Sequence, residues 1–301
     1  MSRVPYNQLD IFIAIANQGS IRGAARQLQI TSPSVSQALK QLEQQLGLPL
    51  FIRTTRSIEL TDAGRELLEA THPAMQQLNL AMDSVKSMGV EPSGKLRITL
   101  PKFVFQIFLQ PLYAEFCRRY PKIDLDVSLD DQSVDLIKDG YDLGIRFGDR
   151  ISDTMVAKRL TPDIPVAIFA SPEYLAHHPK PKVPDELKCH KQIKYRFLGS
   201  RKFAPMLVEK EGKSVEIDMD SAIIVNDTDM ITDAAIQGLG VAIGALPSVK
   251  HHLESGRLQP LLQEHWVSLA GLHLYYVQGS QKAKRVRALI DFLTEHSVKA
   301  W

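Results

Sequence analysis

The sequence predicts an α+α/β fold: a small helical head, one long helix and a large α/β domain. Residues 1–60 carry apolar residues at helical spacing, residues 61–88 continue this spacing in one long run, and residues 93–301 alternate between strand-like and helix-like patterns. The 301 residues correspond to about two ordinary domains. With 44% hydrophobic and 23% charged residues, the composition is typical of a folded globular chain.

The composition also excludes several classes of protein. No run approaches the roughly 18 consecutive apolar residues of a membrane helix, and residues 1–10 lack the basic start and apolar middle of a signal peptide. Cys117 and Cys189 are too few for a disulfide framework, and neither belongs to a C-x-x-C pair. We therefore expect a cytoplasmic protein without a membrane partner.

Two short helices are predicted in the first 30 residues. The first has four apolar residues on one face: Leu9, Phe12, Ile13 and Ala16. The second begins after Ser20, a good N-cap residue, and runs to Leu28 before residues 29–31 interrupt the pattern.

A third helix is predicted from Ser32 as N-cap, with Pro33 at the first helical position and Gly47 at the end. An apolar stripe should face inward, formed by Val35, Leu39, Leu42 and Leu46. Five polar residues should face outward: Ser34, Gln37, Lys40, Gln41 and Gln44. Two helices joined by a tight turn, the second polar at its N-terminal end, are typical of a helix-turn-helix unit.

A short basic hairpin should follow, because Leu50, Phe51 and Ile52 precede the polar residues 53–56, which include Arg53 and Arg56, and Ile58 and Leu60 then alternate with polar neighbours. The whole chain has a net charge of only +2, from 36 basic and 34 acidic residues. Residues 18–57, however, hold five basic residues against the single acid Glu43, a formal charge of +4, which leaves −2 for the rest. This local excess favours a nucleic-acid partner.

The pattern predicts how such a head would contact double-stranded DNA. Gln37 has the geometry to bond adenine in the major groove, and Lys40 to reach guanine or phosphate. Arg53 and Arg56 would neutralise phosphates, which sets affinity rather than sequence preference. The alternative is that these polar residues form only a solvated face. The predicted DNA-binding residues are Arg22, Ser32, Pro33, Ser34, Ser36, Gln37, Lys40, Arg53 and Arg56.

A long helix is predicted from Thr61, a plausible N-cap, to residue 88, about 42 Å at 1.5 Å per residue. Seven residues recur at spacings of four and three and define a heptad seam: Leu67, Thr71, Ala74, Leu78, Ala81, Val85 and Met88. We expect this seam to pair with a second copy, the alternative being packing on its own chain. Pro73 should kink the helix.

From about residue 93 the sequence alternates between strand and helix patterns, as in an α/β domain. Strands are expected near 96–100, 123–129, 142–147, 164–170, 222–226, 240–244 and 272–277, and helices near 227–238 and 281–296. Such alternation predicts mostly parallel sheets.

Specific segments resemble the LysR-type transcriptional regulator family. The segment from Ile21 through Gly64, IRGAARQLQITSPSVSQALKQLEQQLGLPLFIRTTRSIELTDAG, is similar to the N-terminal domain of that family. Later segments resemble its effector domain, including PLYAEFCRRYPKIDLDVSL, VDLIKDGYDLGIRFG and VNDTDMITDAAIQGLGVAIGALP. The resemblance covers nearly the whole chain.

The resemblance implies a winged helix-turn-helix domain (1–60), a dimerising linker helix and hinge (61–92), and an effector domain (93–301). The effector domain would have two α/β subdomains, like periplasmic solute-binding proteins: subdomain 1 at about 93–162 plus 270–301, and subdomain 2 at about 163–269. The implied function is sequence-specific regulation of transcription by a homodimer or homotetramer. Its partners would be a pseudo-palindromic promoter site, a small-molecule effector and RNA polymerase, with no cofactor.

Two strand ends are candidate effector sites, because ligands of open α/β sheets bind beyond the carboxyl ends of strands, and by resemblance both line the cleft between subdomains. Lys102 could attract a carboxylate group, so an anionic effector is expected, although Asp227 would repel an anion unless it points away. The alternatives are a solvated Lys102 and a merely helix-capping role for Asn226 and Asp227. The candidate effector-binding residues are Thr99, Pro101, Lys102, Phe103, Phe147, Asn226, Asp227 and Thr228.

Other chemistries find little support. The glycines of GLGVAIG follow a helix and precede a strand, the wrong order for a dinucleotide loop, and favour a helix end and close packing instead. The pairs His177–His178 and His251–His252 lack zinc-site spacing, so no metal site is expected. We expect Cys117 in the core and Cys189 half-buried, a redox-sensitive thiol being the alternative for Cys189.

The sequence fits two rival functions less well. A solute-binding receptor fits the C-terminal part of the chain, but it leaves the first 90 residues without a purpose and has no export signal. An enzyme would need an acid, a base and a nucleophile in one constellation, which the sequence does not offer.

Overall fold

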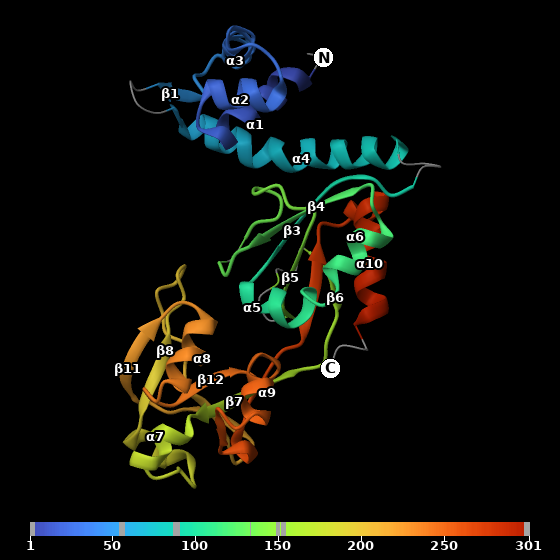
Figure 1. Ribbon diagram of the computed structural model, residues 1–301. Coiled ribbons are helices and arrows are strands. Elements are labelled where there is room, and N and C mark those ends of the chain that lie inside the picture. The colour runs from blue at the N-terminus through green and yellow to red at the C-terminus, as the bar shows by residue number, and fades with distance from the viewer. Residues whose placement is uncertain are drawn as a thin grey trace. The chain divides into compact units, whose positions relative to one another are not determined.

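The computed structural model describes residues 4–53, 58–86, 91–132, 134–148, 151 and 155–297 (Figure 1). The chain forms two compact units, Met1–Met88 and Gly89–Trp301. Among the described residues, no helix combines the length and apolar character needed to cross a membrane.

Three helices form the core of the N-terminal unit: α1 (Tyr6–Gln18), α2 (Ile21–Leu28) and α3 (Ser32–Leu46). The side chains of Phe12, Val35 and Leu39 are fully buried among them, as the apolar spacing predicts. The predicted cap of α2 is confirmed, because Ser20 Oγ accepts a hydrogen bond from the amide of Gly23 at 3.0 Å.

Two details of the predicted third helix are wrong. Thr31, not Ser32, is the N-cap of α3, since its Oγ1 accepts from the amide of Ser34 at 3.3 Å. Adjacent hydroxyl residues compete for this role, and Pro33 fits the first turn in either register. Leu46 is 45% exposed rather than inward-facing, because the helix ends there, before Gly47 at φ 73°.

A hairpin and a long helix complete this unit. Strands β1 (Phe51–Arg53) and β2 (Ile58–Leu60) pair antiparallel, which confirms the predicted wing. Helix α4 (Asp62–Lys86) begins after Thr61, whose Oγ1 accepts from the amide of Gly64 at 3.0 Å, and it continues through Pro73. The polar seam residue Thr71 is accommodated because its hydroxyl donates to the carbonyl of Leu67 at 2.6 Å.

The C-terminal unit has two lobes; the described strands form one sheet in the first lobe and three in the second. In the first lobe a five-stranded sheet has the order β4-β3-β5-β15-β6. Its strands are β3 (Gly94–Leu100), β4 (Ile123–Leu129), β5 (Leu143–Phe147), β6 (Val156–Arg159) and β15 (Leu272–Tyr276). Helices α6 (Tyr113–Arg119) and α10 (Lys284–His296) lie side by side against it, with the rings of Phe116 and Phe292 5.3 Å apart (Figure 1). The short α5 (Lys102–Val104) and a π-helical turn (Phe105–Leu109) follow β3.

The second lobe is built around β7 (Ile164–Ala170), whose apolar residues are buried on both faces of the sheet. Ala167 and Phe169 belong to one core cluster, and Ile168 and Ala170 to another. Its antiparallel neighbours are β12 (Ala242–Ala245), β13 (Gln259–Leu261) and β14 (Ser268–Leu269). The other strands are β8 (Lys191–Tyr195), β9 (Leu207–Lys210), β10 (Lys213–Glu216) and β11 (Asp220–Val225), and the helices are α7 (Pro172–His177), α8 (Thr228–Ile236) and α9 (Leu246–Glu254).

Two expectations for this unit are wrong. Among the described strands only β3–β4, β3–β5 and β8–β11 pair in parallel, so the sheets are mixed. The chain leaves the first lobe after β6 and returns at β15, which enters the sheet antiparallel to both neighbours. Cys117 and Cys189 are both exposed, because Phe116 fills the inward face of α6 and Leu187 that of the 3₁₀ turn Pro184–Cys189.

Candidate functional site

The exposed face of α3 is the candidate DNA-binding surface. Burial of Val35, Ala38 and Leu39 fixes the rotation of this helix, so its other face turns to solvent. Pro33, Ser34, Gln37 and Lys40 are exposed on α3, and Arg22 is exposed on α2. Ser32 and Ser36 are half-buried. The hydroxyl groups of Ser34 and Thr31 are 2.8 Å apart, so the first turn of the helix is internally ordered.

The wing is described in part. The backbone of Arg53 pairs with Ile58 at the end of β1. The side chain of Arg53 and the whole of Arg56 lie outside the described residues.

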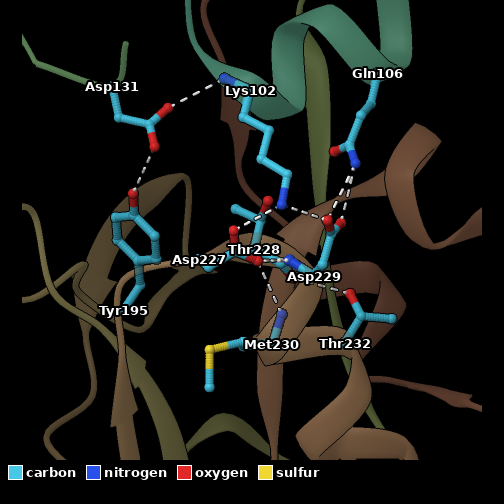
Figure 2. Close-up of polar contacts among 9 residues, drawn as sticks. All are labelled: Lys102, Gln106, Asp131, Tyr195, Asp227, Thr228, Asp229, Met230 and Thr232. Carbon is cyan, nitrogen blue, oxygen red and sulfur yellow. Dashed lines mark hydrogen bonds and ion pairs between the residues drawn. The ribbon is translucent and has the colours of Figure 1, made fainter. Parts of the chain in front are cut away.

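Lys102 connects the two lobes of the C-terminal unit. It follows β3 in the first lobe, and its Nζ lies 2.7 Å from Asp227 Oδ2 and 2.7 Å from Asp229 Oδ2 in the second lobe (Figure 2). The hydrogen bond to Asp227 is the largest cause that raises the pKa of the Lys102 ammonium above its ordinary value, and the hydrogen bond to Asp229 is the next. The bond between Lys102 and Asp227 is also the main cause that lowers the pKa of the Asp227 carboxyl. Both partners are therefore held in their charged forms.

Asp227 also caps α8 with its other oxygen. Its Oδ1 accepts from the amides of Asp229 at 2.9 Å and Met230 at 3.2 Å. The capping interpretation of this residue is thus correct, and it does not exclude the contact with Lys102.

Further hydrogen bonds surround this ion pair, and the pairs Gln106–Asp229 and Tyr195–Asp131 join the lobes. Gln106 Nε2 donates to Asp229 at 3.2 Å, the backbone amide of Lys102 donates to Asp131 at 3.3 Å, and Tyr195 donates to Asp131 at 3.5 Å (Figure 2). Sequence reasoning missed Gln106, Asp131, Tyr195 and Asp229. A usable signal existed for both acids, because Asp131 follows the carboxyl end of β4 and Asp229 lies in the first turn of α8.

This geometry bears on the prediction that Lys102 attracts an anionic effector. The ammonium already has two carboxylate partners, and with Asp131 the cluster has three acids against one base, a formal charge of −2. An incoming carboxylate would have to displace bound carboxylates and approach a negative site.

The other candidate residues lie near the same strand ends. Thr99 is fully buried, and its Oγ1 has no hydrogen-bond partner among the described atoms. Pro101 is buried at the start of α5, and the rings of Phe103 and Phe147 are 5.6 Å apart within the core of the first lobe. Thr228 begins α8, whereas Asn226 is exposed and is not the cap.

The candidate metal ligands and the glycines of GLGVAIG can be compared with the structure. Within the part of the chain that the structure describes, no group of three or more His, Cys, Asp or Glu side chains is placed to hold a metal ion. Gly238, at φ 77°, follows α8, and a Cβ on Gly240 would lie 2.5 Å from the carbonyl oxygen of Lys191. These glycines therefore serve a helix end and close packing, as predicted.

A helix-turn-helix head with a wing, a long helix and a two-lobed α/β domain together define a ligand-responsive regulator of transcription. Comparison with known proteins agrees with this class. Residues 6–65 match the family model described as bacterial regulatory helix-turn-helix protein, lysR family, and residues 89–298 match the LysR substrate binding domain. The chain belongs to the LysR family of transcriptional regulators, which are regulators and not enzymes.

Individual relatives match over nearly the full length. The HTH-type transcriptional regulator PgrR of Escherichia coli K12 is 31% identical over 293 residues, covering 97% of this chain and 98% of that one. The probable HTH-type transcriptional regulator LtrA of Klebsiella pneumoniae is 34% identical, covering 95% and 93%. The structure of CrgA, a LysR-type regulator from Neisseria meningitidis, aligns with a TM-score of 0.61 at 26% identity and covers 99% of both chains.

Proposed function

We propose that this LysR-type regulator binds a pseudo-palindromic double-stranded DNA site with α3 in the major groove and the wing on neighbouring phosphates. The observation that carries the proposal is the exposed face of α3, where Ser34, Gln37 and Lys40 lie opposite the buried residues. The excess of basic residues in the head supports it, because phosphate contacts supply most of the affinity. The contacting residues are Arg22, Ser32, Pro33, Ser34, Ser36, Gln37, Lys40, Arg53 and Arg56.

A small-molecule effector binds between the lobes in this proposal. The strand ends at Thr99–Phe103 and Asn226–Thr228 meet there through the Lys102–Asp227 contact. The proposed lining residues are Thr99, Pro101, Lys102, Phe103, Phe147, Asn226, Asp227 and Thr228, together with Asp131, Tyr195 and Asp229. The negative cluster favours a neutral or cationic effector over an anionic one.

Self-association through α4 and the effector domain belongs to the same proposal. Leu78 in the heptad seam is 43% exposed in the single chain, which supports burial against a second copy. Such an assembly would act at a promoter in the cytoplasm, where RNA polymerase is the partner through which bound DNA affects transcription.

A gel-shift titration tests the DNA proposal. The probe is the duplex beside the chain's own coding region, and the comparison is Gln37→Ala against Gln44→Ala, a matched change at an exposed position later in α3. We expect Gln37→Ala to relax preference at one base position, a loss of roughly 1–3 kcal/mol of discrimination, while Gln44→Ala keeps it. Equal sequence preference in both variants, or no salt-sensitive shift at all, would contradict the proposal.

A further inference from the structure

Glu43 is the one acid among residues 18–57, and the structure shows what its carboxylate does. The residue lies in the C-terminal half of α3 and is half-buried. Its Oε1 accepts hydrogen bonds from the backbone amides of Leu50 at 2.9 Å and Phe51 at 3.4 Å. Phe51 is the first residue of β1, so this single oxygen links α3, the helix proposed to enter the major groove, to the wing.

Other contacts fix the opposite side of the same segment. Thr61, just before α4, donates its hydroxyl to the carbonyl of Pro49 at 2.8 Å and its amide to the carbonyl of Leu50 at 3.0 Å. The side chain of Leu50 is 1% exposed, and the ring of Phe51 lies 5.4 Å from that of Phe12. Residues 49–51 are therefore held by Thr61 on their carbonyls and by Glu43 on their amides.

We propose that Glu43 is a positioning residue for DNA binding, whose carboxylate fixes the wing relative to the recognition helix. The inference rests on the proposed function, in which the wing contacts phosphates. A carboxylate on a basic DNA-binding head opposes binding electrostatically. The two hydrogen bonds that Glu43 accepts from the backbone make it favour DNA binding instead. They fix the position of the wing, and a fixed wing keeps its basic residues on the phosphates.

The two effects predict different results for two of three substitutions, Glu43→Asp and Glu43→Ala, and Glu43→Gln is the reference for both. Glu43→Gln removes the charge but keeps an Oε1 acceptor, so the full-length variant should bind DNA as tightly as the wild type or more tightly. Glu43→Asp keeps the charge but withdraws the oxygens by one methylene group, and Glu43→Ala removes the acceptor. Both should bind more weakly. A purely electrostatic role instead predicts unchanged binding for Glu43→Asp and tighter binding for Glu43→Ala.

The experiment measures the salt dependence of binding to a mixed-sequence duplex, with Arg53→Ala introduced into each background. In the wild type Arg53→Ala should flatten the slope of log K against log salt by about one unit. In Glu43→Ala and Glu43→Asp the same change should have little further effect, because the wing is already displaced. Glu43→Gln should retain the full effect of Arg53→Ala.

Two controls separate the possible failures. Amide hydrogen exchange at Leu50 and Phe51 should accelerate in Glu43→Asp but not in Glu43→Gln, while the thermal unfolding midpoint of both variants stays close to the wild type. A full Arg53 effect in Glu43→Asp, with wild-type affinity, overturns the positioning role. If Arg53→Ala leaves the wild-type slope unchanged, the proposed wing contact itself fails, and amide exchange alone decides whether Glu43 anchors β1.

Discussion

Single residues in this protein serve two purposes at once, and Asp227 shows how. One of its oxygens caps α8, and the other binds the ammonium of Lys102. A sequence pattern predicts the first role, because an acid before a helical run is a cap signal. It cannot predict the second, because the partner is 125 residues away in the chain.

His190 gives the effector domain a pH-dependent stability. Its ring is 4% exposed, its Nδ1 lies 3.3 Å from the hydroxyl of Tyr174, and the ring of His178 lies 6.2 Å away. Burial, followed by the charge of His178, lowers the pKa of His190, although Glu186 and the backbone of Pro179 oppose this shift. The unfolded chain therefore binds the additional proton more readily.

The sign of the effect follows from that difference. Stability is fully present above the unfolded pKa of 6.5 and falls as the pH drops below it, until the folded group also titrates. We expect the thermal midpoint to decrease between about pH 7.5 and about pH 5.5, and His190→Gln to flatten this decrease. His177→Gln, an exposed residue of the same lobe, is the control. An equally steep decrease in His190→Gln would assign the pH dependence to other groups.

At the scale of elements, the predictions from sequence succeeded where the signal is local. The helices have caps and periodic apolar faces within a few residues of each other, so α1, α2 and α8 were located from the sequence. The same local reasoning failed at Thr31, where two neighbouring hydroxyl residues offer equivalent caps. Strand direction was also mispredicted, because β15 pairs with strands more than 100 residues earlier.

The heptad seam of α4 predicts that two copies of the chain associate through this helix. Leu78 lies in the heptad seam and is 43% exposed, so a second copy would bury it. We expect Leu78→Glu to weaken self-association at least about tenfold, since an unpaired carboxylate would be buried in the interface. Sedimentation of the full chain at several concentrations measures this change.

The matched control for α4 is Gln76→Glu, which adds the same charge at a heptad position outside the seam. It should leave the sedimentation behaviour of the wild type unchanged. If both variants dissociate alike, net charge and not the seam controls assembly. If neither does, α4 is not the dimerisation element.

At the scale of the whole effector domain, polar groups add to an apolar contact between the lobes, in which Ala245 of β12 belongs to the core cluster of the first lobe. Lys102, Gln106 and Asp131 from one lobe meet Tyr195, Asp227 and Asp229 from the other. Each exposed ion pair contributes only about 0–1 kcal/mol, so these polar contacts add only a small free energy to the balance between arrangements of the lobes. An effector that binds one arrangement more tightly than another can shift such a balance, whereas equal affinity for both shifts nothing.

Lys102→Met tests whether this contact sets the arrangement of the lobes. The substitution keeps a long side chain but removes the ammonium, so Asp227 and Asp229 lose the cation between them and repel each other. We expect a larger radius of gyration for residues 91–301, measured by small-angle neutron scattering of the full chain with that part deuterated. We also expect a changed response to salt, because exposed charges are screened. Lys95→Met is the control, since Lys95 pairs with Asp126 inside the first lobe alone.

Asp227→Asn should reproduce part of the expansion while still capping α8, because asparagine is a good N-cap residue. Scattering from Lys102→Met that matches the wild type would show that apolar contacts, and not this ion pair, hold the lobes together.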